Sequence, residues 1–355
     1  MEFLEKLLNY YHLSKEDYEY MSRPLSEVHL LDAASIEGMD KIVTRIHKAI
    51  ELKEKIIIYG DYDCDGVSAT SILVKTFMKL NYPVYHYIPS RYIDGYGLNL
   101  ENVRKMKNNG FSLIITVDNG ISTFEAIDEA NKLGIDVIVV DHHEVQNNTL
   151  PNAYAILHPT VSHVSEIYAS GGYMSLFLSS ALLGYYDHYL VTIAGLSVIS
   201  DLMELKDYNR DVVRLAINNL KTYRYLPLML LVDNSEVISE KTFSLEIAPK
   251  INAIGRLFED KSVNKLVNYL TSEDNNEIIV LASFIKDANE KRKELTKLAA
   301  ENISKEDLNE DAIILRLDIK EGLIGLVANK LLNEYNKVAI IYREAVERLL
   351  HNLDS

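Results

Sequence analysis

Three aspartates stand two residues apart, directly after an apolar segment. The stretch IIIYGDYDCDG covers residues 56–66, and its aspartates are Asp61, Asp63 and Asp65. Carboxylates this close repel one another, and each loses hydration as it approaches a protein core. A bound cation is the simplest way to offset both costs. The spacing therefore predicts a metal site at the end of this segment.

Three further acidic or histidine clusters follow apolar segments in the same way. They are Asp118 in VDNG (117–120), Asp141, His142 and His143 in VDHHE (140–144), and Asp201 in SD (200–201). Aspartates with one or two histidines suit divalent cations such as Mn²⁺ or Mg²⁺. Structural zinc more often uses cysteine, and Cys64 is the one cysteine present. Two cations held by bridging carboxylates are a common arrangement for hydrolysing phosphate esters with an activated water.

Each cluster by itself also has a structural explanation. An aspartate after a strand is often the N-cap of the next helix or a turn residue. Two adjacent histidines are more often surface or core residues than metal ligands. The four clusters together are much harder to explain in this way. We therefore interpret them as parts of one site.

The elements that must bring these clusters together are predicted to be parallel strands. Short, β-branched apolar segments lie at 55–60, 82–88, 112–117 and 135–140, and helical patterns separate them at about 67–80, 99–109 and 123–133. This alternation predicts an α/β fold with a parallel sheet and helices on both faces. Ligands bind beyond the carboxyl ends of the strands in such a sheet, where three of the clusters lie.

The rest of the chain predicts a helical subregion, a connector and a second small unit. The pattern is mostly helical from about 170, a long charged helix covers 272–300, and strand, helix and strand follow from about 311. We predict four parts: an N-terminal helical segment (1–34), a catalytic domain (35–271), a connector helix (272–304) and an incomplete second α/β domain (305–355).

The composition is that of an ordinary globular protein with an acidic balance. The 355 residues include 37 Lys and Arg against 52 Asp and Glu, a net charge of −15. This disfavours a basic nucleic-acid coat protein, but an enzyme with a local basic groove stays possible. No apolar run is long enough to span a membrane, and the N-terminus lacks the pattern of a secretion signal. The single cysteine fits a reducing compartment, so we expect a cytoplasmic protein.

The order of the motifs DYDCDG, VDNG, VDHH and SD resembles the DHH phosphoesterase superfamily. More narrowly, it is similar to the RecJ-like single-strand-specific 5′→3′ DNA exonucleases. Five further segments carry the resemblance: YIPSRYIDGYGLN (87–99), ASGGYMSLFLSSALLG (169–184), GLSVISDLMELKDYNR (195–210), APKINAIGRL (248–257) and KEGLIGLVANKLLNEYNKVAII (320–341). The resemblance extends over about residues 35–342.

The resemblance implies a role for each residue of the site. Two divalent ions, expected to be Mn²⁺ with Mg²⁺ as the alternative, would be held by Asp61, Asp63, Asp65, Asp118, His142 and Asp201. Asp118 would bridge the ions, and His143 would complete the catalytic set beside the scissile phosphate. Arg91 and Arg256 would contact phosphate groups, with Asn252 supporting the same surface. Many members have a metal-binding histidine where this chain has Tyr59, so one ion is expected to have fewer ligands.

The implied function is metal-dependent cleavage of single-stranded DNA from its 5′ end, in DNA repair and recombination. Single-stranded DNA and other replication or repair proteins would be the partners, with no membrane. Two alternatives stay open: an oligoribonuclease or 3′,5′-bisphosphate phosphatase of the same superfamily, and a non-catalytic nucleic-acid-binding protein. The family's second domain, DHHA1, carries a glycine- and serine-rich motif that grips the nucleic-acid end. This chain has REAVERLLHNLDS at that point, so we expect a C-terminally truncated RecJ-like protein with a weakened DNA grip.

Overall fold

Five parallel strands form the centre of the fold. The computed structural model describes residues 2–164, 169–233, 236–301, 303 and 312–343. The strands are β1 (Lys55–Tyr59), β2 (Tyr85–Tyr87), β3 (Phe111–Val117), β4 (Asp136–Val140) and β5 (Ala155–Leu157), in the order β2-β1-β3-β4-β5. Every neighbouring pair is parallel. The predicted α/β fold with a parallel sheet is therefore confirmed.

The side chains of β1 show why its sequence is apolar without interruption. Successive residues of a strand point to opposite faces of the sheet. Ile56 and Ile58 pack into the larger core on one face, and Ile57 and Tyr59 pack into a smaller core on the other. None of the four is more than 6% exposed. Both faces of the strand are thus covered by other elements, as in most parallel sheets.

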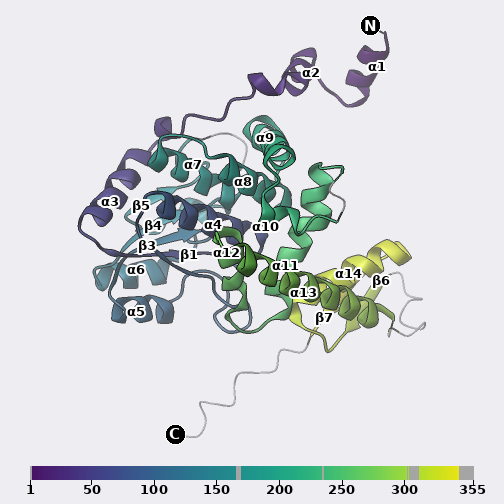
Figure 1. The fold of residues 1–355 in the computed structure, drawn as a ribbon. Helices are drawn as coiled ribbons and strands as arrows, with labels where there is room; N and C mark the ends of the chain where they lie inside the picture. Colours follow the sequence, from purple (N-terminus) through teal and green to yellow (C-terminus); the bar gives the residue numbers. More distant parts are fainter. Residues whose placement is uncertain (1, 165–168, 234–235, 302, 304–311, 344–355) are drawn as a thin grey trace, which may run out of the picture.

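Helices cover both faces of the sheet (Figure 1). One face carries α3 (Met39–Glu51), α4 (Cys64–Lys79), α7 (Gly171–Leu183) and α8 (His188–Ser200), and the other carries α5 (Leu100–Asn108) and α6 (Phe124–Lys132). Most residues of α7 and α8 are buried, which explains why these helices are apolar on nearly every side. Among the described residues, no helix has both the length and the apolar character needed to span a membrane.

A helical subregion and a long connector follow the sheet. They comprise α9 (Asp207–Tyr223), α10 (Leu226–Met229), α11 (Ala248–Leu257), α12 (Asn264–Thr271) and the long α13 (Asn275–Glu301). A π-helical segment, Thr242–Ile247, runs directly into α11. Such segments are frequent near functional sites, and α11 carries Asn252 and Arg256. Short 3₁₀ turns lie at Leu25–Glu27, Ala33–Ser35, Gln146–Asn148 and Lys261–Val263.

A second, smaller α/β unit packs beside α13 (Figure 1). It consists of β6 (Ala312–Arg316), α14 (Glu321–Tyr335) and β7 (Val338–Tyr342), with the two strands parallel. On the outer face of this small sheet, Ile314 and Ile340 are 60% and 51% exposed. The predicted second α/β unit is therefore present. The division of the chain into four domains stays a prediction, and the predicted break in the family pattern at 344–355 lies outside the described residues.

The N-terminal helices α1 (Glu2–Tyr10) and α2 (Lys15–Ser22) extend away from the rest of the chain (Figure 1). A capping box between Ser14 and Asp17 begins α2. The end of this segment is tied to α9, because Tyr20 and Arg23 both donate hydrogen bonds to Asp211. Polar contacts thus anchor the end of this segment to α9.

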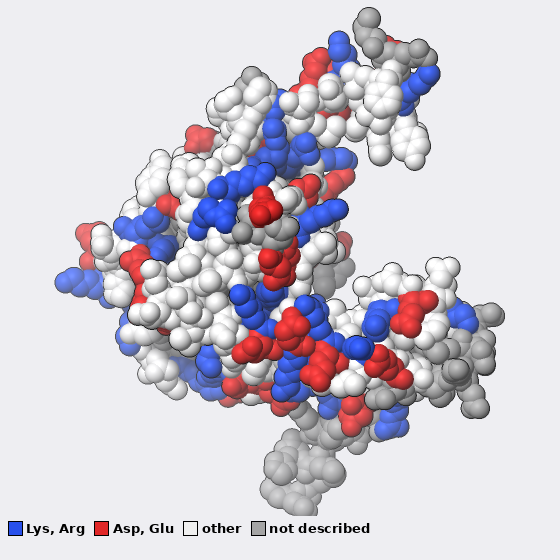
Figure 2. Space-filling view, turned by 45° about the vertical axis from the view of Figure 1, so that its right-hand side comes forward, with Lys and Arg blue, Asp and Glu red and all other residues white. Residues whose placement is uncertain are grey.

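The acidic balance of the chain does not produce a uniformly acidic surface. On the face seen in Figure 2, basic and acidic side chains are interspersed, with groups of Lys and Arg beside groups of Asp and Glu. Part of the negative charge is instead carried by buried carboxylates, including those of Asp61, Asp65 and Asp118. The net charge of −15 therefore reflects an acidic interior site as well as the surface.

Candidate metal centre

The carboxyl ends of β1, β3 and β4 lie side by side. Tyr59 pairs with Thr116, and Val117 pairs with Val140, so the three strands end at nearly the same level. The residue after β3 extends the ladder by one bond, because the Asp118 N–H donates to the Val140 carbonyl at 3.0 Å. The segments that follow these strands therefore begin at one edge of the sheet.

The turn after β1 leads directly into α4. Asp63 is the N-cap of this helix, and its Oδ1 accepts hydrogen bonds from the Asp65 N–H at 2.9 Å and the Gly66 N–H at 3.0 Å. The turn is tight, because a Cβ on Gly66 would lie 2.5 Å from the Asp61 carbonyl oxygen. The N-cap role and a ligand role are compatible for Asp63, since a carboxylate has a second oxygen.

Asp61 lies buried in this turn, with 4% of its surface exposed. Among the described residues, its Oδ1 atom has no hydrogen-bond partner. Burial and then the nearby charge of Asp63 raise the pKa of Asp61 to about 8. A buried carboxylate oxygen without a donor is stabilised by a nearby cation.

Asp65 is held by the start of α7. The N–H groups of Gly171 and Gly172 donate to its Oδ2 and Oδ1, each at 2.8 Å, and the Ser197 hydroxyl also donates to Oδ1. A Cβ on Gly171 would lie 2.6 Å from the Cβ of Asp118, and a Cβ on Gly172 would lie 2.4 Å from the Ser197 hydroxyl. The two glycines therefore let the helix backbone approach the carboxylate cluster.

Asp118 follows β3 directly and lies at the centre of the cluster. It is 2% exposed and has a left-handed backbone conformation, with φ of 59°. Its Oδ1 lies 3.0 Å from His142 Nε2. Burial and the charges of Asp65 and Asp63 raise the pKa of Asp118 well above the usual value. Asp118 does not cap a helix, so the helix-cap explanation does not apply to it.

Asp141 orients the two histidines that follow β4. Its Oδ1 accepts hydrogen bonds from the His142 N–H at 2.7 Å and from His143 Nδ1 at 2.8 Å, and its Oδ2 accepts from the Ile121 N–H. Burial opposes ionisation of Asp141, but the hydrogen bond and positive charge of His143, together with the Ile121 N–H, outweigh it and lower the pKa of Asp141 to about 2. Asp141 was expected in the cluster from the sequence, but without a role of its own.

The two histidines have different surroundings. His142 is buried, and burial lowers its pKa, so its imidazole is neutral and able to bind a metal. The side chain of His143 is 44% exposed. Burial opposes its charged form, but the hydrogen bond to Asp141 and the charges of Asp141 and Asp201 together outweigh this and raise the pKa of His143 to about 9.

Asp201 closes the cluster from the other side. It is the C-cap of α8, and its Oδ2 lies 3.5 Å from His142 Nε2. Its side chain is 29% exposed. Burial and then the charge of Asp65 raise the pKa of Asp201 to about 7.

The predicted ligands form three overlapping groups. In each group the ligand atoms lie within 4.8 Å of one another: Asp61, Asp63 and Asp118; Asp65, His142 and Asp201; and Asp118, His142 and His143. Asp118 and His142 each belong to two groups, so neighbouring cations would share ligands. The structure brings all seven predicted metal-binding and catalytic residues together. Asp63 and Asp65, both predicted as metal ligands, fall into different groups.

Tyr59 does not take part in these groups. Its hydroxyl donates to the Gly97 carbonyl at 3.0 Å and accepts from Asn102 Nδ2 at 3.1 Å. Its ring lies beside Tyr87 in the smaller core. Tyr59 therefore supports the 88–99 loop instead of contributing to the metal centre.

The three residues predicted to contact nucleic acid have different neighbours. Asn252 Oδ1 accepts a hydrogen bond from the Cys64 N–H at 2.8 Å, so this side chain supports the metal-centre turn. The Arg91 guanidinium stacks over the Tyr62 ring at 4.2 Å, and the buried Nε of Arg91 has no partner among the described residues. Arg256 Nη1 donates to the Gly322 carbonyl at 3.0 Å.

A third arginine belongs to the same neighbourhood. Burial, and then the charges of Arg91 and Arg292, lower the pKa of Arg256. Arg292 lies on α13 and donates to Asn289 Oδ1 at 3.0 Å. Within the described part of the chain, no carboxylate forms an ion pair with any of these three guanidinium groups. The sequence analysis did not predict a role for Arg292, because it lies in the charged segment NEKRKEL. Such a segment is typical of a solvent-exposed helix face.

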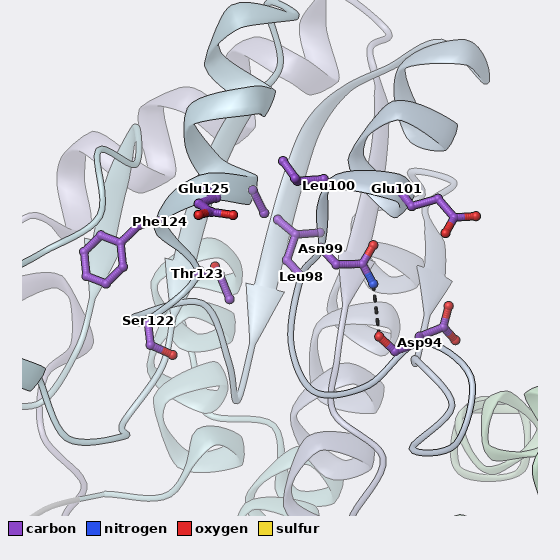
Figure 3. A pocket seen from close by; sticks show the side chains of 10 residues that line it. Asp94, Leu98, Asn99, Leu100, Glu101, Ser122, Thr123, Phe124 and Glu125 are labelled. Atoms are coloured by element: carbon purple, nitrogen blue, oxygen red, sulfur yellow. Dashed lines mark hydrogen bonds between the residues drawn. The ribbon is translucent and has the colours of Figure 1, made fainter. Parts of the chain in front are cut away.

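A hollow near this edge of the sheet lies outside the carboxylate cluster. A cavity of about 760 Å³ opens between the starts of α5 and α6, and Figure 3 shows its lining. Asn99 donates to the Asp94 carbonyl at 3.3 Å across its floor. The side chains of Asp94, Glu101 and Glu125 make the lining acidic, so it is poorly suited to phosphate groups. We assign the cavity no part in the chemistry.

The order and geometry of these clusters match a known family. Residues 55–218 match the model of the DHH family, N-terminal domain. This part of the chain, residues 55–218, is thus a DHH-family domain. The resemblance seen in the sequence is thus confirmed.

Two curated relatives are named RecJ. The chain is 36% identical over 322 residues to the single-stranded-DNA-specific exonuclease RecJ of Bacillus subtilis (strain 168), covering 87% of this chain and 40% of the relative. It is 30% identical over 349 residues to RecJ of Escherichia coli (strain K12), covering 89% of this chain and 60% of the relative. The chain therefore spans between two-fifths and three-fifths of the length of these relatives.

Solved structures give the same picture. Exonuclease RecJ bound to manganese matches with a TM-score of 0.77 and 26% identity, over 87% of this chain and 80% of that one. RecJ of Thermus thermophilus in complex with Mn²⁺ matches with a TM-score of 0.79 and 26% identity, over 95% of this chain and 50% of that one. CDC45 from Entamoeba histolytica, at 12% identity and a TM-score of 0.56, shares the fold alone.

Proposed function

We propose that this chain is a metal-dependent phosphodiesterase that degrades single-stranded DNA from its 5′ end. The observation that carries the proposal is that two ligand groups are joined by a third, which contains Asp118 from one of them and His142 from the other. An arrangement of this kind suits two adjacent cations better than one. The similarity to RecJ over most of this chain supports the choice of substrate.

The donor set fits two divalent ions, with Mn²⁺ expected and Mg²⁺ as the alternative. Carboxylate and imidazole ligands suit both ions. The unpartnered Oδ1 of Asp61 and the raised pKa values of Asp61 and Asp201 support a cation at this position. RecJ structures with Mn²⁺ and with Mg²⁺ support these two metals. When bound, two such ions would supply an activated water and positive charge beside the scissile phosphate.

The side chains divide into three tasks. Asp61, Asp63 and Asp118 would hold one ion, and Asp65, His142 and Asp201 would hold the other. Asp141 fixes His143 through Nδ1, which leaves His143 Nε2 to exchange a proton with an oxygen of the phosphate. Arg91 and Arg256, which lack ion-pair partners among the described residues, bind phosphate oxygens of the strand, and Asn252 steadies the turn that carries the ligands.

The proposed substrate suggests a setting. Degrading single-stranded DNA would place the protein in the cytoplasm, with other replication or repair proteins as partners. The proposed organisation is an N-terminal segment (1–34), a catalytic domain (35–271), a connector (272–304) and a second unit (305–355). In this organisation the first of the two α/β units supplies all the chemistry.

The first experiment is Mn²⁺-dependent release of nucleotides from a 5′-phosphorylated single strand. We expect cleavage of the single strand, much less cleavage of the matched duplex, and none with Asp118→Ala. Cleavage restricted to dinucleotides would favour the oligoribonuclease or bisphosphate phosphatase alternative. Strand binding without cleavage, in a protein that binds Mn²⁺, would favour the non-catalytic alternative.

A further inference from the structure

Three elements meet where the smaller α/β unit docks on the rest of the chain. They are the 88–99 loop, the end of α11 and the start of α14, and Figure 1 shows α11 and α14 side by side. The Tyr92 hydroxyl donates to the Arg256 carbonyl at 2.5 Å and accepts from the Gly322 N–H at 3.3 Å. Arg256 Nη1 in turn donates to the Gly322 carbonyl at 3.0 Å. Tyr92, Arg256 and Gly322 thus form a closed set of hydrogen bonds.

These hydrogen bonds pair backbone groups at the end of α11 and at the start of α14. The first N–H groups and the last carbonyl groups of a helix have no partners within it. Lys320, the N-cap of α14, gives no side-chain cap, and the Tyr92 hydroxyl takes that place for Gly322. Lys320 Nζ instead donates to the Leu257 carbonyl, in the last turn of α11, at 2.9 Å. Each helix end therefore depends on groups from outside its own helix.

Gly322 brings the two backbones into direct contact. A Cβ at this position would lie 2.6 Å from both the Cα and the carbonyl oxygen of Arg256. Neither atom can move without moving α11. Gly325, one turn further along α14, has no atom within 4 Å of an added Cβ. The close approach is thus specific to the residue that bonds the Arg256 side chain.

The same helix also contacts the metal-centre turn. A Cβ on Gly255 would lie 2.5 Å from the Tyr62 carbonyl oxygen, and Asn252 accepts from the Cys64 N–H. Arg256 therefore stands on a helix that contacts both the proposed metal centre and α14. Its guanidinium is close enough to Asp63 and Arg91 for their charges to influence its pKa.

We propose that Tyr92 and Gly322 are positioning residues for Arg256. Docking of α14 through these two residues sets the direction of the Arg256 guanidinium, which then meets a phosphate group of the strand. The smaller α/β unit takes part in substrate binding in this way without contacting the metal ions. This inference rests on the proposed function, and it names residues that contribute to the affinity for the strand.

The test is the affinity of each variant for a fluorescently labelled, 5′-phosphorylated single strand in EDTA, where no cleavage occurs. Tyr92→Phe keeps the ring and removes both hydroxyl bonds, and we expect its Kd to rise about tenfold. In Mn²⁺, its KM should rise while kcat stays nearly unchanged. Gly322→Ala should weaken binding in the same direction. The matched control is Tyr82→Phe, which loses a hydroxyl bond of 2.5 Å to the Glu54 carbonyl, before the start of β1, and should bind like the wild type.

A double-mutant cycle separates positioning from a general structural effect. If Tyr92 acts through Arg256, adding Tyr92→Phe to Arg256→Ala should cause no further loss of affinity. Additive losses would overturn the inference, and so would wild-type affinity in a folded Tyr92→Phe protein. Both results leave the proposed function standing. If the wild type neither binds nor cleaves the strand, the proposed function itself is wrong, and this inference is wrong with it.

Discussion

At the scale of the residue, Asp118 lies where a negative charge is unfavourable. It is buried, it faces other carboxylates, and its backbone lies in the left-handed region that aspartate and asparagine tolerate better than most residues. Nothing in the packing of the core requires a charge at this point. Local features that oppose stability are typical of functional sites, and this supports our interpretation of Asp118 as the shared ligand.

Asp118→Asn should therefore separate stability from activity. Asparagine fits the same backbone and removes the repulsion, so the metal-free variant should melt at the wild-type temperature or higher. Nucleotide release in Mn²⁺ should fall by at least about 100-fold, because loss of a ligand costs more than loss of its supporting contacts. Thermal melts in EDTA and strand-degradation assays measure the two effects.

The control for this variant is Asp128→Asn, which changes an exposed aspartate of α6 and should alter neither quantity. A clear loss of metal-free stability in Asp118→Asn would contradict the prediction. It would mean that Asp118 serves the fold more than the site.

At the scale of the element, the start of α7 links the helical layer to the metal centre. Its first two N–H groups hold both oxygens of Asp65, and its glycines leave room for Asp118 and Ser197. The helix thus orients one carboxylate and limits the position of another. In the same way, α4 fixes Asp63 as its N-cap and α8 presents Asp201 at its C-terminus. Three helix ends therefore build the cluster together with the strand ends.

Gly171→Ala should disturb this arrangement. The added Cβ would lie 2.6 Å from the Cβ of Asp118 and 2.8 Å from its Oδ1. We expect overpacking to cost about 1–3 kcal/mol of unfolding free energy. Mn²⁺ affinity should fall by about 10- to 100-fold, because a supporting contact of the ligands is displaced. Urea denaturation and Mn²⁺ titration measure these two quantities.

Gly325→Ala is the matched control within another helix. Its added Cβ meets no atom within 4 Å, and replacing a helical glycine by alanine stabilises by about 0.5–1 kcal/mol. Mn²⁺ affinity should not change. Equal effects of the two substitutions would show that the start of α7 has no special relation to the metal centre.

At the scale of the whole molecule, the buried carboxylates should couple stability to pH. In the metal-free fold the pKa is about 8 for Asp61 and about 7 for Asp201, whereas unfolded aspartates titrate near about 3.9. The folded state therefore binds more protons than the unfolded state between about pH 4 and pH 8. Stability of the metal-free protein should fall as the pH rises through that range.

Mn²⁺ should reverse this trend, because it binds the deprotonated ligands of the folded state. We expect the rise in melting temperature on adding Mn²⁺ to be larger at about pH 8 than at about pH 5. Thermal melts in Mn²⁺ and in EDTA at both pH values provide the measurement, and Asp118→Asn should show a smaller rise. An equal rise at both pH values would argue against carboxylate ligands.

Sequence patterns were sufficient to predict the sheet and the composition of the site. The strands predicted at 55–60, 112–117 and 135–140 differ from β1, β3 and β4 by one residue at most, because strands buried on both faces are continuously apolar. The meeting of the acidic and histidine side chains after those strands could also be predicted, because parallel strands direct their carboxyl ends to one edge. The two edge strands were predicted less well. β2 is shorter than its predicted segment, and β5 was not predicted.

The combination of distant residues, in contrast, became visible only in the folded chain. Folding divides Asp63 and Asp65 between two ligand groups, turns Tyr59 toward Gly97, directs Asn252 to the metal-centre turn, and brings Arg292 to the other arginines. It also joins Tyr92 to Gly322 across 230 positions of sequence. The spacing of apolar residues and the local charge predict which face of a helix or strand is buried. They carry no information on which side chain of another element lies opposite, because that depends on the packing of the complete chain.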